Sequence, residues 1–151
     1  MFLFGPRTGD RARDQLIRKT RSQIAAIGRK AEKSRNRSVR RSVKELTVRW
    51  KTLLSRLSTE PLLFPVLSRY FARNLPVVDN LVSSAMQLVP HAAESKVAAS
   101  TRFRVERMLE KMLADLVRLV EQVDRQAFGD IHDEMDVLDA QFRLEHLPPK
   151  E

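Results

Sequence analysis

Apolar residues recur along the first third of the chain at the spacing of amphipathic helices. From Asp10, which can serve as an N-cap, a thin apolar stripe begins and is interrupted by Thr20 and Gly28. Its members are Leu16, Ile17, Ile24, Ile27 and Ala31. Residues 33–38 contain no apolar side chain and predict a turn. A second helix then shows a cleaner i, i+3/i+4, i+7 stripe, made by Val39, Val43, Leu46, Trp50, Leu53, Leu54 and Leu57.

Prolines punctuate the middle of the chain. Thr59 can cap a third helix, and Pro61 is tolerated in its first turn, where no amide donor is missed. Pro65 requires that turn to be short or kinked. Asn74-Leu75-Pro76 predicts the end of this helix, because proline removes an intrahelical hydrogen bond. Residues 77–89, rich in Val and Leu, predict a separate and deeply buried helix.

The longest apolar stripe runs from about residue 91 to Phe128 and stops at Gly129, a favourable C-cap. One helix of this length would measure roughly 55 Å, whereas a compact chain of 151 residues has a diameter of roughly 40 Å. We therefore expect either an elongated protein or a break near residues 98–101. A final helix is expected from Asp130 to Leu147.

These elements predict an all-α fold: an elongated antiparallel helical bundle with one long helix in its C-terminal half and a basic N-terminal helical arm. Within a single domain we expect an apolar leader (1–9), the basic helical arm (10–58), a helical core (59–147) and a tail (148–151). The side chains expected in the core are Leu46, Trp50, Leu67, Phe71, Leu81, Leu109, Leu116, Leu138 and Phe142.

The chain contains no cysteine, which excludes a disulfide framework and thiolate metal sites and is compatible with a reducing compartment. The apolar start Phe2-Leu3-Phe4 is ended by Gly5-Pro6 before it reaches the length of a signal-peptide core. No run approaches the roughly 18 apolar residues of a spanning helix. We expect a cytoplasmic protein, with a peripheral position at the inner face of the membrane left open.

Charge is distributed unevenly along the chain. Residues 1–58 carry 17 Lys/Arg against 4 Asp/Glu, residues 59–110 carry 6 against 5, and residues 111–151 carry 5 against 10. The basic third attracts anionic partners, whereas the acidic end can repel them or fold back onto the basic arm. Intramolecular neutralisation is the simplest interpretation of this asymmetry.

Catalytic motifs are absent from the sequence. There is no Gly-x-Ser-x-Gly elbow, no Asp-x-Asp pair opening a strand and no glycine-rich phosphate loop. None of the three histidines has a second histidine at i+3 or i+4 with which to bind a metal. The acidic cluster Asp130, Asp133, Glu134, Asp136 and Asp139 fits a solvated helix face better than a cation site. We expect no enzyme, no metal site and no cofactor.

The basic arm carries the strongest functional signal. Its candidate residues for binding an anionic partner are Arg11, Arg18, Arg21, Arg29, Lys30, Arg35, Arg37, Arg40 and Arg41. They can lie along nucleic acid, lie on an anionic membrane, or sit in water or against the acidic end. Phe2, Leu3 and Phe4 are candidates for membrane contact, because apolar insertion adds to charge attraction there. Nucleic acid is less favoured, since no recognition motif or stacking aromatic set is present.

Two stretches resemble a known family. Residues 67–76 read Leu-Ser-Arg-Tyr-Phe-Ala-Arg-Asn-Leu-Pro, and residues 128–138 read Phe-Gly-Asp-Ile-His-Asp-Glu-Met-Asp-Val-Leu. With the short Leu/Phe/Gly leader and the basic arm, this layout resembles the 5-bromo-4-chloroindolyl phosphate hydrolysis protein family, the XpaC-like proteins. The resemblance spans about residues 60–147. It implies a helical accessory protein associated with TelA-like toxic-anion resistance proteins, and it implies no phosphatase residues.

Three hypotheses about function result. The leading one is a non-enzymatic helical interaction protein of XpaC-like type, which acts with a TelA-like helical partner in toxic-anion (tellurite) resistance or envelope stress, with a position at the membrane surface left open. The second is a nucleic-acid-binding helical module that uses the basic arm. The third is a hydrolase linked to phosphate-ester hydrolysis. A homo-oligomer is compatible with all three.

Overall fold

A computed structural model describes residues 8–88 and 95–125 of the chain. In chain order its elements are α1 (Thr8–Glu32), α2 (Arg37–Thr59), the 3-10 helix η1 (Pro61–Leu63), α3 (Phe64–Gln87) and α4 (Lys96–Arg125). No strand occurs among the described residues. The prediction of an all-α helical bundle is confirmed.

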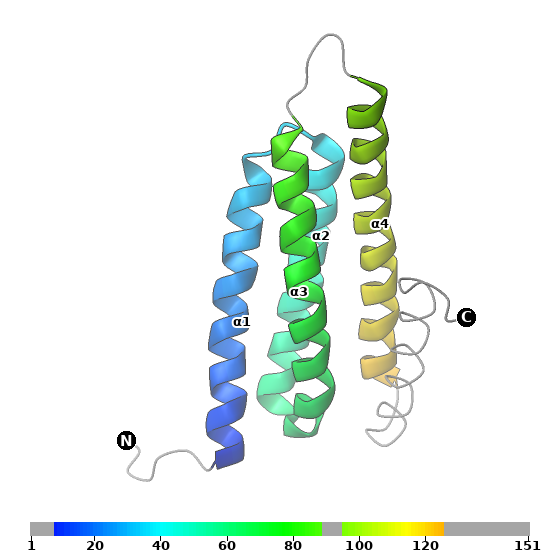
Figure 1. Ribbon diagram of the computed structural model, residues 1–151. Coiled ribbons are helices and arrows are strands. Elements are labelled where there is room, and N and C mark those ends of the chain that lie inside the picture. The colour runs from blue at the N-terminus through cyan, green and yellow to red at the C-terminus, as the bar shows by residue number, and fades with distance from the viewer. Residues whose placement is uncertain (1–7, 89–94, 126–151) are drawn as a thin grey trace, which may run out of the picture.

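The four α-helices alternate in direction, so consecutive helices are antiparallel (Figure 1). α1 contacts α2 and α3, and α4 contacts the same two helices, so α1 and α4 lie on opposite sides of the α2–α3 pair. The 30 residues of α4 span about 45 Å, and they continue without a break through residues 98–101. The long helix is therefore accommodated by an elongated bundle.

One hydrophobic core joins all four helices. Ile24 and Ile27 of α1 and Leu53 of α2 belong to the same cluster as the buried residues of α3 and α4. The predicted basic arm, residues 10–58, thus shares one core with α3 and α4. Of the side chains expected in the core, Leu46, Trp50, Leu67, Phe71, Leu109 and Leu116 are buried, Leu81 is partly buried against the cluster, and Leu138 and Phe142 lie outside the described residues.

The turn between α1 and α2 is held by local hydrogen bonds. Asn36 is the N-cap of α2: its side-chain oxygen accepts from the Val39 N–H at 3.1 Å. The Asn36 side-chain nitrogen donates to the Glu106 carboxylate of α4 at 2.8 Å. Ser34 Oγ accepts from the Asn36 N–H at 3.1 Å. The polar residues that predict a turn therefore also attach it to α4.

The start of α3 differs from the prediction. Thr59 does not cap it, because α2 continues through Thr59, whose hydroxyl donates to the Arg56 carbonyl at 3.2 Å. The chain then passes through η1, which places Pro61 in a first turn where its missing N–H costs nothing. The short turn that Pro65 requires is provided by η1, directly before α3.

The predicted break at Asn74-Leu75-Pro76 is wrong, because α3 is continuous and contains Pro76 in its interior. Pro76 and Ala72, four residues earlier, are both exposed. The Ala72 carbonyl that loses its helical partner can therefore bind water, and the proline ring lies on the solvent side. Residues 77–87 are accordingly the second half of α3 and form no separate helix.

Candidate anion-binding face

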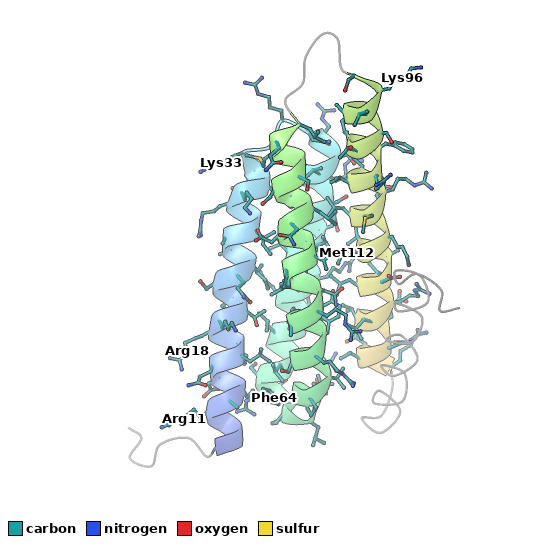
Figure 2. All side chains as sticks on the ribbon, in the orientation of Figure 1. Arg11, Arg18, Lys33, Phe64, Lys96 and Met112 are labelled. Atoms are coloured by element: carbon teal, nitrogen blue, oxygen red, sulfur yellow. The ribbon has the colours of Figure 1, made fainter. Side chains whose placement is uncertain are left out.

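The outer side of α1 is basic because its apolar side is used by the core. Ile17, Ile24, Ile27 and Ala31 are buried, at a spacing that fills one side of a helix. The opposite side carries the exposed candidate residues Arg11, Arg18, Arg21 and Arg29. Figure 2 shows Arg11 and Arg18 extending away from the bundle.

α2 repeats this arrangement. Its buried side includes Leu46 and Trp50, and its outer side carries Arg37, Arg41, Lys44 and Lys51, all exposed. Lys44 and Lys51 were not among the candidates from the sequence. The signal for them was present, because they continue the helical period of Arg37 and Arg41 on the side opposite the apolar stripe.

α1 and α2 pack side by side, so their exposed sides adjoin. At Gly28 an added Cβ atom would lie 3.9 Å from Thr47 Oγ1 of α2. We define the α1–α2 basic face as the exposed cations Arg11, Arg18, Arg21, Arg29, Arg37, Arg41, Lys44 and Lys51. None of these eight side chains forms an ion pair with another described residue. The charges of these eight side chains are therefore not compensated by direct ion pairs within the described part of the bundle.

Lys30 and Arg40 have roles inside the fold. The Lys30 ammonium donates to the Asp79 carboxylate at 2.6 Å and to Ser83 Oγ at 2.7 Å, which ties α1 to α3. The Arg40 guanidinium donates to the Ser34 carbonyl at 2.5 Å in the turn. We leave both out of the basic face, while Arg35 is exposed in the turn at its end.

Several candidates lie outside the described residues. They are the leader residues Phe2, Leu3 and Phe4, the three histidines, and the acidic cluster of residues 130–139. Among the residues that the structure describes, no group of three or more His, Cys, Asp or Glu side chains is placed to hold a metal ion. None of the described helices has the length and apolar character needed to cross a membrane.

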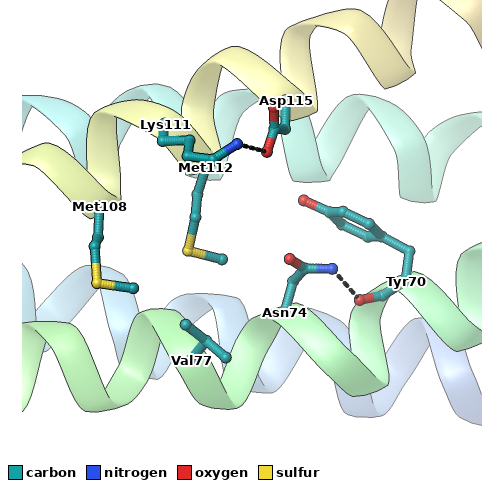
Figure 3. A pocket seen from close by; sticks show the side chains of 7 residues that line it. All are labelled: Tyr70, Asn74, Val77, Met108, Lys111, Met112 and Asp115. Atoms are coloured by element: carbon teal, nitrogen blue, oxygen red, sulfur yellow. Dashed lines mark hydrogen bonds and ion pairs between the residues drawn. The ribbon is translucent and has the colours of Figure 1, made fainter. Parts of the chain in front are cut away.

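A cavity of about 40 Å³ lies between α3 and α4 (Figure 3). Tyr70, Asn74 and Val77 of α3 and Met108, Lys111, Met112 and Asp115 of α4 line it. This volume admits a few water molecules at most, so the cavity has no room for an organic substrate. The sequence did not predict it, because the pattern of one helix does not reveal how well a second helix fills the space beside it.

Tyr70 is a partly buried polar side chain that lines this cavity. Its hydroxyl accepts a hydrogen bond from Trp50 Nε1 at 3.1 Å. Burial raises the pKa of the Tyr70 hydroxyl above its ordinary value of 10.0, the Asp115 charge adds to the increase, and the Trp50 hydrogen bond opposes it. The raised pKa keeps the Tyr70 hydroxyl in its neutral form at physiological pH.

A comparison of the chain with protein-family models found no match, and comparisons with curated proteins and with solved structures found none either. These comparisons neither support nor contradict the resemblance to XpaC-like proteins. The feature of the structure that bears on a possible anionic partner is the α1–α2 basic face.

Proposed function

We propose that this protein is a non-enzymatic helical interaction protein whose α1–α2 basic face binds an acidic helix of a partner protein. One observation carries the proposal. The apolar sides of the adjacent helices α1 and α2 are buried in the same core, and the cations of the α1–α2 basic face are exposed and form no ion pair with a described residue. Because the buried stripes fix both helices in the bundle, the cations are held at regular spacings.

The spacing of the cations matches the repeat of an α-helix laid alongside. Arg11, Arg18 and Arg29 are seven and eleven residues apart, which corresponds to about 10.5 and 16.5 Å along α1. Acidic residues at i, i+4 and i+7 of a partner helix recur with the same rise and can face such a row. Each exposed ion pair contributes only about 0.2–1 kcal/mol, so several pairs must form together.

A lipid surface fits the described residues less well. Amphipathic helices bind membranes by burying their apolar side, but the apolar sides of α1 and α2 are already in the core. Within the described parts of α1 and α2, a single large apolar side chain is exposed: that of Val48, which is 54% exposed. Lipid binding by these helices would therefore depend on charge alone.

Nucleic acid also fits less well, because these helices offer no ring on which a base can stack. Trp50 is the aromatic residue of α1 and α2, and it is fully buried. Phosphate contacts alone would remain, and these give binding without sequence preference.

The resemblance to XpaC-like proteins adds a candidate partner. It suggests a TelA-like helical protein and a role in tellurite resistance or envelope stress. A partner held at the inner face of the membrane would bring this protein there through protein contacts.

The proposal is tested with two variants that change charge equally. A face variant carries Arg18→Gln, Arg21→Gln, Arg29→Gln and Arg41→Gln. A control variant carries Lys96→Gln, Arg104→Gln, Arg107→Gln and Arg125→Gln on α4, all at exposed positions. Each variant lowers the net charge of +9 by four. Deleting residues 1–58 is unsuitable, because it removes α1 and nearly all of α2 from the core.

Three probes separate the partner classes at 0.1 M salt. They are a coiled-coil peptide with Glu at exposed i, i+4 and i+7 positions, vesicles of equal parts phosphatidylglycerol and phosphatidylcholine, and a DNA duplex. We expect the peptide to bind most tightly and the face variant to bind it about tenfold or more weakly, because four ion pairs are lost. The control variant should bind almost as well as the native protein. Tighter binding of vesicles or duplex, or no binding of any probe, would refute the proposed partner class.

A further inference from the structure

The two halves of α4 differ in charge. Residues 96–107 carry four Lys/Arg and one Asp/Glu, whereas residues 108–125 carry three Lys/Arg and four Asp/Glu. The single acid of the first half, Glu106, is half-buried and engaged within the bundle. Its carboxylate accepts from the Asn36 side-chain nitrogen at 2.8 Å and pairs with Arg102 at 3.4 Å. The outer side of residues 96–107 is therefore basic, with no acidic side chain exposed on it.

Two large apolar side chains are exposed on this half of α4. Val97 is 77% exposed and Phe103 is 55% exposed, so neither belongs to the core. We define the α4 patch as these two side chains and the three exposed cations beside them, Lys96, Arg104 and Arg107. At 100° per residue, all five positions fall within about 120° of the helix circumference. The α4 patch thus combines positive charge with uncovered apolar surface.

Arg107 and Phe103 form a pair on the outer side of α4. The Arg107 guanidinium lies over the Phe103 ring, 5.3 Å from the ring centroid. Such a pair suits the boundary between lipid headgroups and acyl chains, where a ring enters the apolar layer and a guanidinium reaches a phosphate. A stacked nucleic-acid base would compete with Arg107 for the ring, and Val97 offers no ring at all. A lipid surface therefore fits the α4 patch better than nucleic acid does.

The α4 patch lies where a flat surface can reach it. α4 packs on the α2–α3 pair on the side opposite α1, and no other described helix lies beyond it (Figure 1). Figure 2 shows Lys96 extending away from the bundle at the end of α4. The buried Val105, two residues after Phe103, is on the opposite side of the helix, so contact with the α4 patch leaves the core intact.

We propose that the α4 patch binds the surface of an anionic membrane. Val97 and Phe103 insert at the boundary of the acyl chains, and Lys96, Arg104 and Arg107 lie among the lipid phosphates. The α1–α2 basic face has the charge for such a contact but exposes only Val48 as a large apolar side chain within the described parts of its helices. Because only two apolar side chains insert, we expect vesicles to bind the α4 patch more weakly than an acidic peptide binds the basic face.

Two fluorescent labels on the full chain test which surface meets the membrane. The chain has no cysteine, so Val97→Cys and Val48→Cys each direct a nitrobenzoxadiazole label to one exposed position. With vesicles of equal parts phosphatidylglycerol and phosphatidylcholine, the label at position 97 should brighten and shift to shorter wavelength, and the label at position 48 should change little. An equal response at both positions, a response at position 48 alone, or no response at either would overturn the proposal.

Substitutions at Phe103 separate apolar insertion from charge attraction. In the chain labelled at position 97, Phe103→Ser should weaken vesicle binding about tenfold, because the apolar contribution of the ring is lost. Phe103→Leu, which stays apolar, should bind nearly as well as the native residue. Equal binding by the two variants would contradict insertion of this side chain. A label at position 97 that responds to single-stranded DNA and not to vesicles would assign the α4 patch to nucleic acid instead.

The charge variants of the preceding section serve here with their roles exchanged. The control variant on α4 removes all three cations of the α4 patch and should lose most vesicle binding at 0.1 M salt, while the face variant should keep most of it. Equal losses in the two variants would show that net charge, and not the α4 patch, attracts the vesicles. Because peptide binding is expected to show the opposite pattern, this inference and the proposed function can fail independently.

Discussion

α2 and α4 are amphipathic helices that enter the same core yet differ on their outer sides. Leu46 of α2 and Leu116 of α4 are both 0% exposed. α4 carries seven Lys/Arg and five Asp/Glu, and among them Lys111 and Arg118 contact Asp115 at 3.3 and 2.6 Å. α2 carries seven Lys/Arg and one Asp/Glu, Glu45.

The comparison shows that folding requires the apolar stripe, which both helices have, and does not require the excess of positive charge, which only α2 has. Both helices bury the same kind of apolar stripe in the core. The excess positive charge of α2 is therefore not needed to form the core. Like charges on neighbouring exposed sites repel, so the surplus costs some stability in the isolated protein. An anionic partner converts that cost into attraction, and this is our interpretation of the basic face.

The largest loss of stability is expected from truncating leucine side chains in the core that α2 and α4 share. Leu46→Ala in α2 and Leu116→Ala in α4 should each lower the free energy of unfolding by about 2–5 kcal/mol, because each leaves a cavity in a close-packed core. Urea denaturation monitored by circular dichroism measures both. Val97→Ala, at a position 77% exposed on α4, is the control and should change stability by less than about 0.5 kcal/mol. A loss below that limit for Leu46→Ala would show that α2 does not share the core.

The second prediction concerns the loss of stability at alkaline pH that the ionisation of Tyr70, on α3, should cause. Because burial raises the pKa of Tyr70 above 10.0 in the folded protein, the unfolded chain loses that proton first. Stability should therefore be unaffected by Tyr70 below pH 10 and should fall above it, with a limiting slope of about 1.4 kcal/mol per pH unit.

Tyr70 is the sole tyrosine of the chain, so its ionisation can be followed directly by ultraviolet absorbance. Phenolate should appear in the folded protein only at a pH clearly higher than in urea. Equal titration curves in the two states would mean that Tyr70 is open to solvent and that α3 and α4 pack more loosely than described.

A smaller change in stability is expected from a substitution at Gly28, where α1 packs against α2. Gly28 is inside α1, and an added Cβ would meet Thr47 Oγ1 at 3.9 Å, an ordinary contact distance. Gly28→Ala should therefore stabilise the protein by about 0.5–1 kcal/mol, because alanine loses less backbone entropy in a helix. Thermal unfolding checks this, and a destabilised variant would indicate a closer approach of the two helices.

The smallest effect compares two neighbouring cations. Lys30→Gln removes the ion pair with Asp79 and should cost up to about 1 kcal/mol. Arg29→Gln removes a member of the basic face and should be neutral within about 0.5 kcal/mol. Chemical denaturation of the two variants side by side provides the measurement. A larger loss for Arg29→Gln would mean that the basic face helps to hold the bundle together.

Helix positions and most of the core could be predicted from sequence, because the apolar period in α2 and α4 is regular enough to identify the buried side. The continuity of α3 through Pro76 could not, since it depends on the proline facing solvent beside Ala72. The cap of the third helix was misplaced for a similar reason: Thr59 suits an N-cap locally, but α2 extends through it.

The candidate site was predictable in part. Exposed arginines of α1 and α2 follow from their place opposite the apolar stripes. The internal role of Lys30 does not follow, because Asp79 is 49 residues away in sequence and approaches only when α1 and α3 pack. Likewise, nothing in the sequence of α3 or α4 alone indicates the cavity beside Tyr70.

The most direct test of the central claim measures unfolding and binding on the same proteins. We expect the face variant to keep the native free energy of unfolding within about 0.5 kcal/mol and to bind the acidic coiled-coil peptide about tenfold or more weakly, while the control variant on α4 keeps both properties. A face variant that unfolds more easily and loses binding in proportion, or that binds as tightly as the native protein, would contradict the claim that the basic face serves recognition and not folding.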